Sequence, residues 1–223
     1  MIKVEKINIS GIDTAVRAMR NPMNSWEKSD SNWVHAGKDE SGIDIFVFDI
    51  GQKDLELMKR LYASGTEHRT YARIMNMSMD ITAPLYWWKE MDRYTVGKSQ
   101  VSTSTMHKIH AKEFSLDNFS HDGLSNLDLD APISENYWDV VIGTLNHFRN
   151  RYLETRDPIY WRQLIELLPS SYNQKRTVSM SYEVVFKIIK ERSHHKLIEW
   201  VDFVNILKEQ PYVTEIIGDE THS

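Results

Sequence analysis

The sequence predicts an α+β fold in which a small, antiparallel-type sheet precedes a predominantly helical C-terminal part. In the N-terminal half, three short segments have the apolar pattern of strands: residues 2–9, 43–50 and 74–81. After residue 135, apolar residues instead recur at helical spacing, in residues 136–155, 159–168, 181–192 and 197–207. The chain of 223 residues contains no internal repeat and no low-complexity linker, so we expect a single domain over residues 1–223.

Two helices are predicted in the N-terminal half, over residues 12–20 and 54–63, because apolar residues recur there three and four positions apart. Asn21-Pro22 is expected to stop the first helix and Gly65 the second. Two polar stretches, residues 24–42 and 117–132, have no helix or strand pattern. The first of them is predicted to be a loop or insertion.

The composition excludes several classes of protein. A net charge of -5 without a basic block argues against a protein that binds duplex DNA through its phosphates. The absence of cysteine excludes disulfides, zinc–thiolate sites and thiolate nucleophiles. The first ten residues, MIKVEKINIS, lack an apolar signal core, and no apolar run is long enough to cross a bilayer. We therefore expect a cytoplasmic protein with no membrane partner.

The stretch from residue 81 to residue 109 has the pattern of a binding segment. Pro84 suits the first turn of an amphipathic helix, on which Glu90 and Arg93 lie three positions apart and can form an ion pair. Gly97 is expected to end or bend this helix. The hydroxyl-rich tract of residues 102–105 follows, and a loop of hydroxyls and backbone N–H groups can hold an anion. The alternative is an amphipathic helix followed by a solvated loop.

Two further groups of donors allow either a binding role or an ordinary one. His68 and Arg73 suit a ligand clamp or a solvated helix end. The run from residue 192 to residue 196 (RSHHK) suits a phosphate or carboxylate site, or a basic helix C-terminus that complements the helix dipole. The chain lacks the HExxH, GxSxG, GxGxxG and GxxxxGK[ST] motifs, so no metal, serine triad, Rossmann site or P-loop is indicated.

The order of these features resembles the flavin-dependent thymidylate synthase family over most of the chain. The helix of residues 15–20, followed by Ser25, is similar to that family's first helix and its Ala-Arg-x-Ser turn. Gly65 and His68 resemble its Gly-His-x-Ser segment. Leu168-Pro169 precedes Arg192 as in the family's LP…LxxR arrangement, whose Arg contacts the substrate dUMP.

The signature RHRxxSxNExSxR of that family is altered in this chain. Aligning the sequences on Ala83-Pro84 places Arg93-Tyr94-Thr95 at Arg-His-Arg, Gln100 at the Asn, Val101 at the Glu and Thr103 at the second Ser. In the family this segment holds flavin phosphates and ribose together with the dUMP phosphate. Only Arg93 is kept.

The resemblance implies a set of binding residues but no catalytic nucleophile, because flavin and folate supply the hydride and the one-carbon unit. The substrate-binding residues would be Glu90, Arg93, Ser102, Thr103, Ser104 and Arg192. The cofactor-binding residues would be His68, Arg73, Tyr94, Gln100, Ser181, His194 and His195. The implied cofactor is FAD, the implied co-substrates are methylenetetrahydrofolate and NADPH, and the implied assembly is a homotetramer with sites between subunits.

The resemblance implies modification of C5 of a pyrimidine deoxynucleotide, most simply the reductive methylation of dUMP to dTMP. Hydroxymethylation of dUMP at the same carbon is an alternative product. A nucleotide-binding protein that has lost its flavin, or a structural oligomer without a ligand, are the alternatives from other classes. A divergent branch of this kind is expected in phages and low-GC bacteria, so the chain is expected to be phage-encoded or bacterial.

Overall fold

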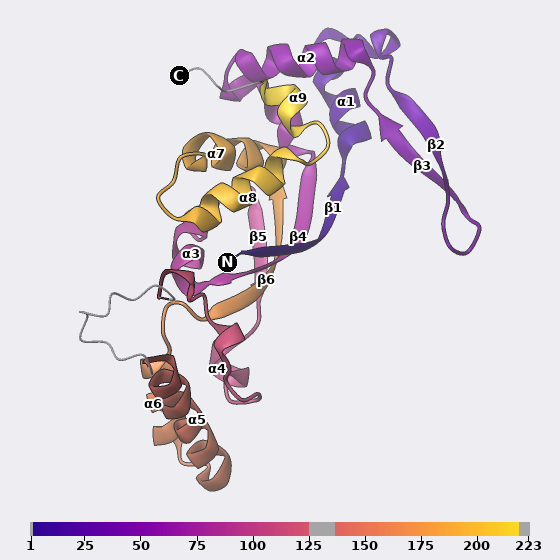
Figure 1. The fold of residues 1–223 in the computed structure, drawn as a ribbon. Helices are drawn as coiled ribbons and strands as arrows, with labels where there is room; N and C mark the ends of the chain where they lie inside the picture. The colour runs from indigo at the N-terminus through magenta and orange to yellow at the C-terminus, as the bar shows by residue number, and fades with distance from the viewer. Residues whose placement is uncertain (1, 125–136, 219–223) are drawn as a thin grey trace. The chain divides into compact units, whose positions relative to one another are not determined.

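The computed structural model describes residues 2–124 and 137–218, and its elements form two compact units (Figure 1). The first unit comprises Met1–Glu5, Asp80–Tyr94 and Gln100–Val178, and the second comprises Lys6–Met79, Thr95–Ser99 and Ser179–Ser223. The chain therefore passes between the units several times. The prediction that all 223 residues form a single domain stays a prediction.

The helices and strands alternate along the N-terminal half and become mainly helical near the C-terminus. The elements up to the central segment are β1 (Lys3–Ser10), α1 (Ile12–Arg20), β2 (Asn32–Lys38), β3 (Asp44–Asp49), α2 (Gln52–Ala63), β4 (Asn76–Pro84) and α3 (Leu85–Met91). The later elements are β5 (Lys98–Ser102), α4 (Thr105–Lys108), α5 (Tyr137–Thr155), α6 (Pro158–Leu167), β6 (Asn173–Ser181), α7 (Tyr182–Arg192), α8 (Ile198–Lys208) and α9 (Val213–Ile217). Short 3-10 turns occupy Asn21–Met23, Trp26–Lys28, Thr66–His68, Thr70–Arg73, Leu116–Asn118 and Asp122–Leu124.

A four-stranded sheet in the order β1-β4-β6-β5 and a separate two-stranded sheet of β2 and β3 confirm the predicted combination of a small sheet with helices. Strand β4 shows the predicted alternation, because Met77, Met79 and Ile81 are buried whereas Ser78 and Asp80 between them are half-buried. The apolar face of this strand forms part of the core, and its polar face is available for hydrogen bonds.

Several helices lie where the sequence predicts them. Helix α1 spans the predicted residues 12–20, and α7 and α8 agree with the prediction to within one residue at each end. Asp157 caps α6 as expected, since its side chain accepts a hydrogen bond of 3.0 Å from the N–H of Ile159 while Pro158 occupies the first turn. Residue 136, where the next helix was predicted to begin, and residues 125–132 of the second polar stretch lie outside the described residues.

The C-terminal part is predominantly helical, as predicted, but a strand that the sequence pattern does not predict, β6, lies between α6 and α7. The inward positions of this strand are Gln174, Val178 and Met180, and Lys175 and Arg176 interrupt the apolar pattern between them. Such a strand has little apolar alternation of its own. It is stabilised by its neighbours β4 and β5 in the sheet.

The structure differs from the prediction in two stretches expected as loops and at one helix end. Residues 24–42 are not a plain loop, because they contain β2, whose partner β3 completes a hairpin. Residues 98–102 form strand β5 and not part of a polar loop. Helix α3 ends at Met91, so Gly97 does not end it; Gly97 has a φ of 76° and forms the turn into β5.

Candidate functional site

In the first unit, helix α3 and the parts of β5 and β6 that belong to this unit carry a network of charged and aromatic side chains. The guanidinium of Arg176 lies over the Trp88 ring, 4.3 Å from its centroid, and donates to Asp92 Oδ1 (2.8 Å) and to Gln174 Oε1 (2.9 Å). The Trp88 indole N–H donates to the Gln174 carbonyl (2.9 Å). Arg176 is therefore fixed on three sides, with only 13% of its side chain exposed.

The predicted residues Glu90, Arg93 and Gln100 lie around this network. Gln100 donates from Nε2 to the same Asp92 Oδ1 (2.6 Å). Arg93 forms the expected ion pair with Glu90 at 3.3 Å, and the Arg93 side chain is largely exposed. The carboxylate of Asp92 thus joins Gln100 to Arg176, a residue that the sequence reasoning missed. No local signal marks Arg176, because its partners lie on α3 and β5, far away in the sequence.

The hydroxyl-rich tract begins at the end of β5 and is mostly committed to the backbone. Thr103 donates from its N–H (2.9 Å) and its hydroxyl (3.2 Å) to the Lys175 carbonyl. The Ser104 hydroxyl accepts from the His107 N–H (2.9 Å) and caps α4. Ser102 is exposed beside them. The predicted anion-binding role of these hydroxyls stays a prediction.

Tyr94, which stands where the resembling family has an imidazole, is buried with 5% of its surface exposed. Its neighbours Arg93 and Thr95 are exposed. In the isolated chain, the ring of Tyr94 therefore belongs to the core. A cofactor could contact Tyr94 only at the edge of the ring that carries the hydroxyl, or after the surrounding residues rearrange. Its assignment as a cofactor-binding residue stays a prediction.

In the second unit, Ser181 lies at the junction of β6 and α7. It is buried, and its N–H donates to the Gly97 carbonyl (2.9 Å). A Cβ atom on Gly97 would come within 3.0 Å of Ser181 Oγ. Ser181 is thus held in close contact with the turn before β5.

The predicted donors after α7 have distinct surroundings. The half-buried Arg192 lies with its guanidinium over the Trp200 ring, 4.8 Å from the centroid. His195 accepts at Nδ1 from the Leu197 N–H (3.1 Å) at the start of α8, whereas His194 is exposed. Arg192 and His195 therefore already make contacts within this chain. A ligand that binds either side chain would bind it in addition to these contacts.

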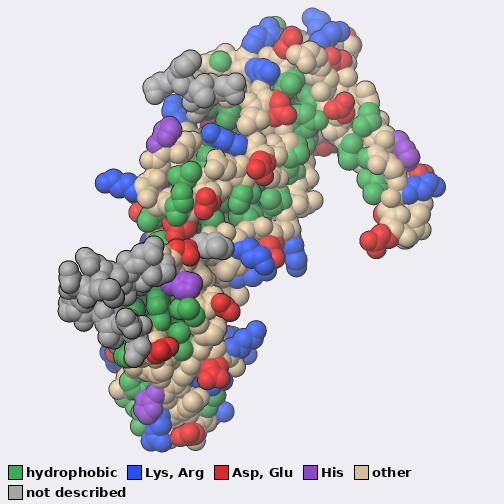
Figure 2. Space-filling model, viewed as in Figure 1, with side chains coloured by type: hydrophobic (Ala, Val, Ile, Leu, Met, Phe, Trp, Pro, Cys, Tyr) green, Lys and Arg blue, Asp and Glu red, His purple; other side chains and the backbone are tan. Residues whose placement is uncertain are grey.

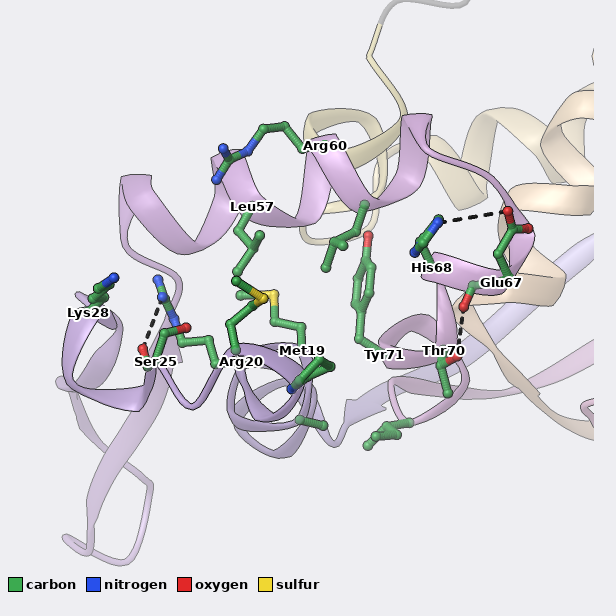
Figure 3. Close-up of a pocket in the computed structure, with 15 residues that line it drawn as sticks. Met19, Arg20, Ser25, Lys28, Leu57, Arg60, Glu67, His68, Thr70 and Tyr71 are labelled. Atoms are coloured by element: carbon green, nitrogen blue, oxygen red, sulfur yellow. Dashed lines mark hydrogen bonds and ion pairs between the residues drawn. The ribbon is translucent and has the colours of Figure 1, made fainter.

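His68 lines a cavity of about 540 Å³ in the second unit (Figure 3). Apolar side chains of α1, α2 and the following turn cover much of its wall: Met19, Leu57, Leu61 and Tyr71. The cationic side chains that line it are Arg20, Lys28 and Arg60, beside His68 and the single carboxylate of Glu67. An apolar wall with cations around it suits an anionic ligand that has a flat apolar part. The predicted clamp residue Arg73 does not line this cavity and is exposed.

Arg20 connects the cavity to a buried carboxylate. Its Nε donates to Asp54 Oδ1 (2.6 Å) and one terminal nitrogen donates to the Ser25 carbonyl (3.2 Å), while the other terminal nitrogen has no hydrogen-bond partner among the described residues. Asp54 Oδ2 accepts from the hydroxyls of Ser29 (2.6 Å) and Ser31 (2.7 Å). The cavity wall at residues 20–31 is thus organised around Asp54.

The pKa of the Asp54 carboxyl is set by opposing effects. Burial alone would raise this pKa, but the hydrogen bonds from Ser29, Ser31 and Arg20 and the charge of Arg20 outweigh it and lower the pKa below its usual range. Asp54 is therefore ionised at neutral pH, and the positive charge of Arg20 is balanced beside the cavity.

The described part of the chain contains neither a metal cluster nor a membrane-spanning helix. Among the described residues, no group of three or more His, Asp or Glu side chains is placed to hold a metal ion. Within residues 2–124 and 137–218, no helix combines the length and the apolar character needed to cross a membrane.

The fold and these sites define an α+β protein with cationic positions suited to an anionic ligand. Two solved structures have a similar fold over nearly the whole chain. The first is the crystal structure of thymidylate synthase X (ThyX) from Helicobacter pylori with FAD and dUMP, with a TM-score of 0.65 and 18% identity over 97% of this chain and 98% of that chain. The second is flavin-dependent thymidylate synthase ThyX from the same organism, complexed with FAD and dUMP, with a TM-score of 0.64 and 17% identity over 99% of this chain and 100% of that chain.

These comparisons confirm that this chain has the fold of flavin-dependent thymidylate synthases. At 17–18% identity they show the fold alone. Neither a family model nor a curated protein sequence matches the chain.

Proposed function

We propose that this protein is a flavin-dependent enzyme that modifies C5 of a pyrimidine deoxynucleotide, most simply by reductive methylation of dUMP to dTMP. The observation that carries this proposal is the similarity of the whole fold to two structures that contain FAD and dUMP. The proposed co-substrates are methylenetetrahydrofolate and NADPH, and the proposed assembly is a homotetramer.

The cavity around His68 fits a flavin nucleotide by its chemistry. Its apolar wall suits a planar ring, and Lys28 and Arg60 supply positive charge for phosphates, whereas the charge of Arg20 is balanced by Asp54. Arg20 also keeps one terminal nitrogen without a hydrogen bond among the described residues, while its other donors are fixed. We therefore assign the flavin to this cavity, with these three cations and His68 as its binding residues.

A bound flavin would supply the hydride chemistry, and the side chains of this chain would bind and orient the reactants. Arg93 and Arg192 are the proposed contacts of the substrate phosphate, because a guanidinium can donate two parallel hydrogen bonds to it. The exposed side chain of Arg93 is accessible for this role. In an assembly with sites between subunits, the two arginines can belong to different chains.

A second candidate is a nucleotide-binding protein without flavin chemistry. The observation that favours it is the burial of Tyr94, together with Thr95 and Val101 at positions that carry charged groups in the resembling signature. This candidate predicts dUMP binding without FAD binding and without turnover.

The absorbance spectrum of the purified protein, followed by FAD titration, separates the two candidates. The enzyme proposal predicts a yellow protein, or one that takes up FAD. We expect the double substitution Lys28→Ala and Arg60→Ala to weaken FAD binding at least about tenfold, since each cation contributes to phosphate binding. The matched control is Arg162→Ala, which removes an exposed arginine of α6 paired with Glu166. A protein that does not bind FAD under any condition would contradict the enzyme proposal.

Thermal shift with dUMP tests the substrate assignment. We expect dUMP to raise the melting temperature of the wild-type protein and Arg192→Ala to abolish that shift, whereas Arg192→Lys keeps a reduced shift because Lys retains the charge but not the planar fork. The melting temperature without ligand reports the loss of the Trp200 contact separately. An unchanged dUMP shift in Arg192→Ala would remove Arg192 from the site, and mass analysis of the product would distinguish methylation from hydroxymethylation.

A further inference from the structure

A groove of about 460 Å³ lies beside the β2–β3 hairpin (Asn32–Lys38 and Asp44–Asp49) in the second unit. Its walls come from the hairpin and from the segments of residues 9–13 and 211–212. It shares no lining residue with the cavity around His68, and the proposed function makes no use of it. Its volume is typical of pockets that hold small molecules.

Aromatic residues form a large part of the groove wall. Trp33, Phe46, Phe48 and Tyr212 line it, and they come from three separate segments of the chain. Trp33 and Phe48 lie edge to face, with ring centroids 5.4 Å apart and an angle of 68° between the ring planes. Trp33 is 58% exposed and Phe46 is 55% exposed, and Figure 2 shows hydrophobic side chains along the hairpin. Rings that form a corner can surround a cation, which is attracted by their negative faces.

The charged side chains at this groove are acidic. Among the described residues that line it, Asp13 and Asp49 carry charge and none is Lys, Arg or His. The Asp49 carboxylate accepts a hydrogen bond from the Tyr212 hydroxyl (3.2 Å). Burial raises the pKa of that hydroxyl, and the negative charges of Asp49 and Glu215 raise it further. The groove therefore attracts cations and disfavours anions.

The backbone of the groove is held in an uncommon conformation at two positions. Tyr212 has a φ of 61°, which is rare for a residue with a large side chain. Its hydroxyl accepts from the Ile50 N–H (3.1 Å) and donates to Asp49, so the ring is fixed at the groove. Gly11 has a φ of 79°, and a Cβ atom there would lie 2.5 Å from the Ile74 carbonyl oxygen. Strained backbone of this kind is concentrated at binding sites.

We propose that this groove binds a small organic cation whose charged nitrogen carries methyl or methylene groups, such as a quaternary ammonium compound. The aromatic wall contacts the apolar groups and attracts the charge, while Asp13 and Asp49 supply the counter-charge. A metal ion does not suit the groove, because no group of three or more His, Asp or Glu among the described residues is placed to hold one. This proposal does not depend on the proposed function, and its tests are carried out without FAD or dUMP.

Fluorine NMR of the protein labelled with fluorotryptophan tests the proposal. The chain contains 7 Trp residues, and the signal that disappears in Trp33→Phe belongs to Trp33. We expect choline to shift this signal saturably, with a dissociation constant of about 10 mM or lower. The matched probe is the neutral alcohol in which carbon replaces the nitrogen of choline, and it should bind at least about tenfold more weakly. Potassium chloride at the same concentration controls for ionic strength.

Substitutions in the wall separate the ring from the charge. Trp33→Leu keeps an apolar side chain without the ring, and Asp49→Asn keeps the shape without the charge. We expect each to raise the dissociation constant of choline at least about fivefold, measured by saturation transfer to the choline methyl groups, whereas Trp33→Phe keeps most of the affinity. The matched controls are Trp26→Leu and Asp44→Asn, which change exposed residues outside the groove and should leave the affinity unchanged. Circular dichroism shows whether each variant is folded.

Several results would overturn the proposal. The first is a Trp33 signal that does not move up to about 50 mM choline. The second is equal affinity for choline and its neutral analogue, which would leave an apolar groove without a cation site. If a trimethyllysine peptide bound and choline did not, the groove would belong to a protein partner. A folded Trp33→Leu or Asp49→Asn protein with unchanged affinity would place the cation elsewhere, and if neither variant folds, the comparison of the two probes on the wild-type protein decides.

Discussion

Substitution of Asp54 by Asn tests the buried ion pair that organises the wall of the cavity around His68. Asp54 is fully buried and accepts hydrogen bonds from Arg20, Ser29 and Ser31, and also from the backbone N–H groups of Asp30 (3.2 Å) and Ser31 (3.3 Å). Asn has nearly the same shape but carries no charge and presents an NH₂ group to donors. Arg20, of which only 5% is exposed, would remain buried without its counter-charge.

The expected cost at pH 7 is about 3–5 kcal/mol, the usual loss when one member of a buried ion pair is removed. That is a large part of a typical unfolding free energy of about 5–15 kcal/mol. Urea unfolding followed by circular dichroism measures the difference. The control is Glu166→Gln, which breaks the exposed ion pair between Arg162 and Glu166 on α6, and which we expect to leave the urea midpoint unchanged.

The pH dependence adds a second test of the same pair. The pKa of Asp54 in the folded protein is below its usual value, so its contribution to stability is fully present above the ordinary carboxyl pKa of about 3.9. This contribution is lost as the pH falls through the folded pKa. The difference between wild type and Asp54→Asn should therefore be constant from about pH 8 to pH 5 and shrink below about pH 4. A loss below about 1 kcal/mol at neutral pH would refute the assignment of Asp54 as the counter-charge of Arg20.

Two glycines and one histidine give further predictions. Gly97→Ala should destabilise the protein by about 1–2 kcal/mol in urea unfolding, because the residue has a φ of 76° and its Cβ would lie 3.0 Å from Ser181 Oγ. Gly143→Ala, inside α5 with nothing within 4 Å of the added Cβ, should instead stabilise the protein by up to about 1 kcal/mol. If both substitutions changed the free energy of unfolding in the same direction, this reasoning would be contradicted. Burial, followed by the charges of Arg156, Lys108 and Arg149, lowers the pKa of His110, so stability should fall as the pH drops through the region below about 6.5. His110→Gln should flatten this part of the pH profile of the urea midpoint, and an unchanged slope would exclude His110 as its cause.

Local patterns in the sequence were sufficient for many of the elements. The apolar stripe of α1 and the cap at Asp157-Pro158 are properties of neighbouring residues, and the structure places both as predicted. The ion pair of Glu90 and Arg93 follows from their spacing of three residues on a helix. His68 was a candidate from its position after Gly65, and it does line a cavity.

The candidate sites could be predicted only in part. The contact between Asp92 and Arg176 joins residues 84 positions apart, and that between Arg20 and Asp54 joins residues 34 positions apart. No periodicity marks such pairs, since each side chain alone has the pattern of a solvated charge. Tyr94 likewise has the sequence position of a binding residue, but its burial follows from the packing around it.

The sequence by itself determined the helices with apolar stripes, the two faces of β4 and the absence of thiol chemistry, because each depends on residues close together in the chain. The tertiary structure alone decided that residues 32–38 and 173–181 are strands. Strand formation depends on a partner elsewhere in the chain, and hydrogen bonding to that partner can offset a weak apolar pattern. Strand pairing also placed Arg176 beside Trp88, and the packing of α1, α2 and the following turns formed the cavity around His68.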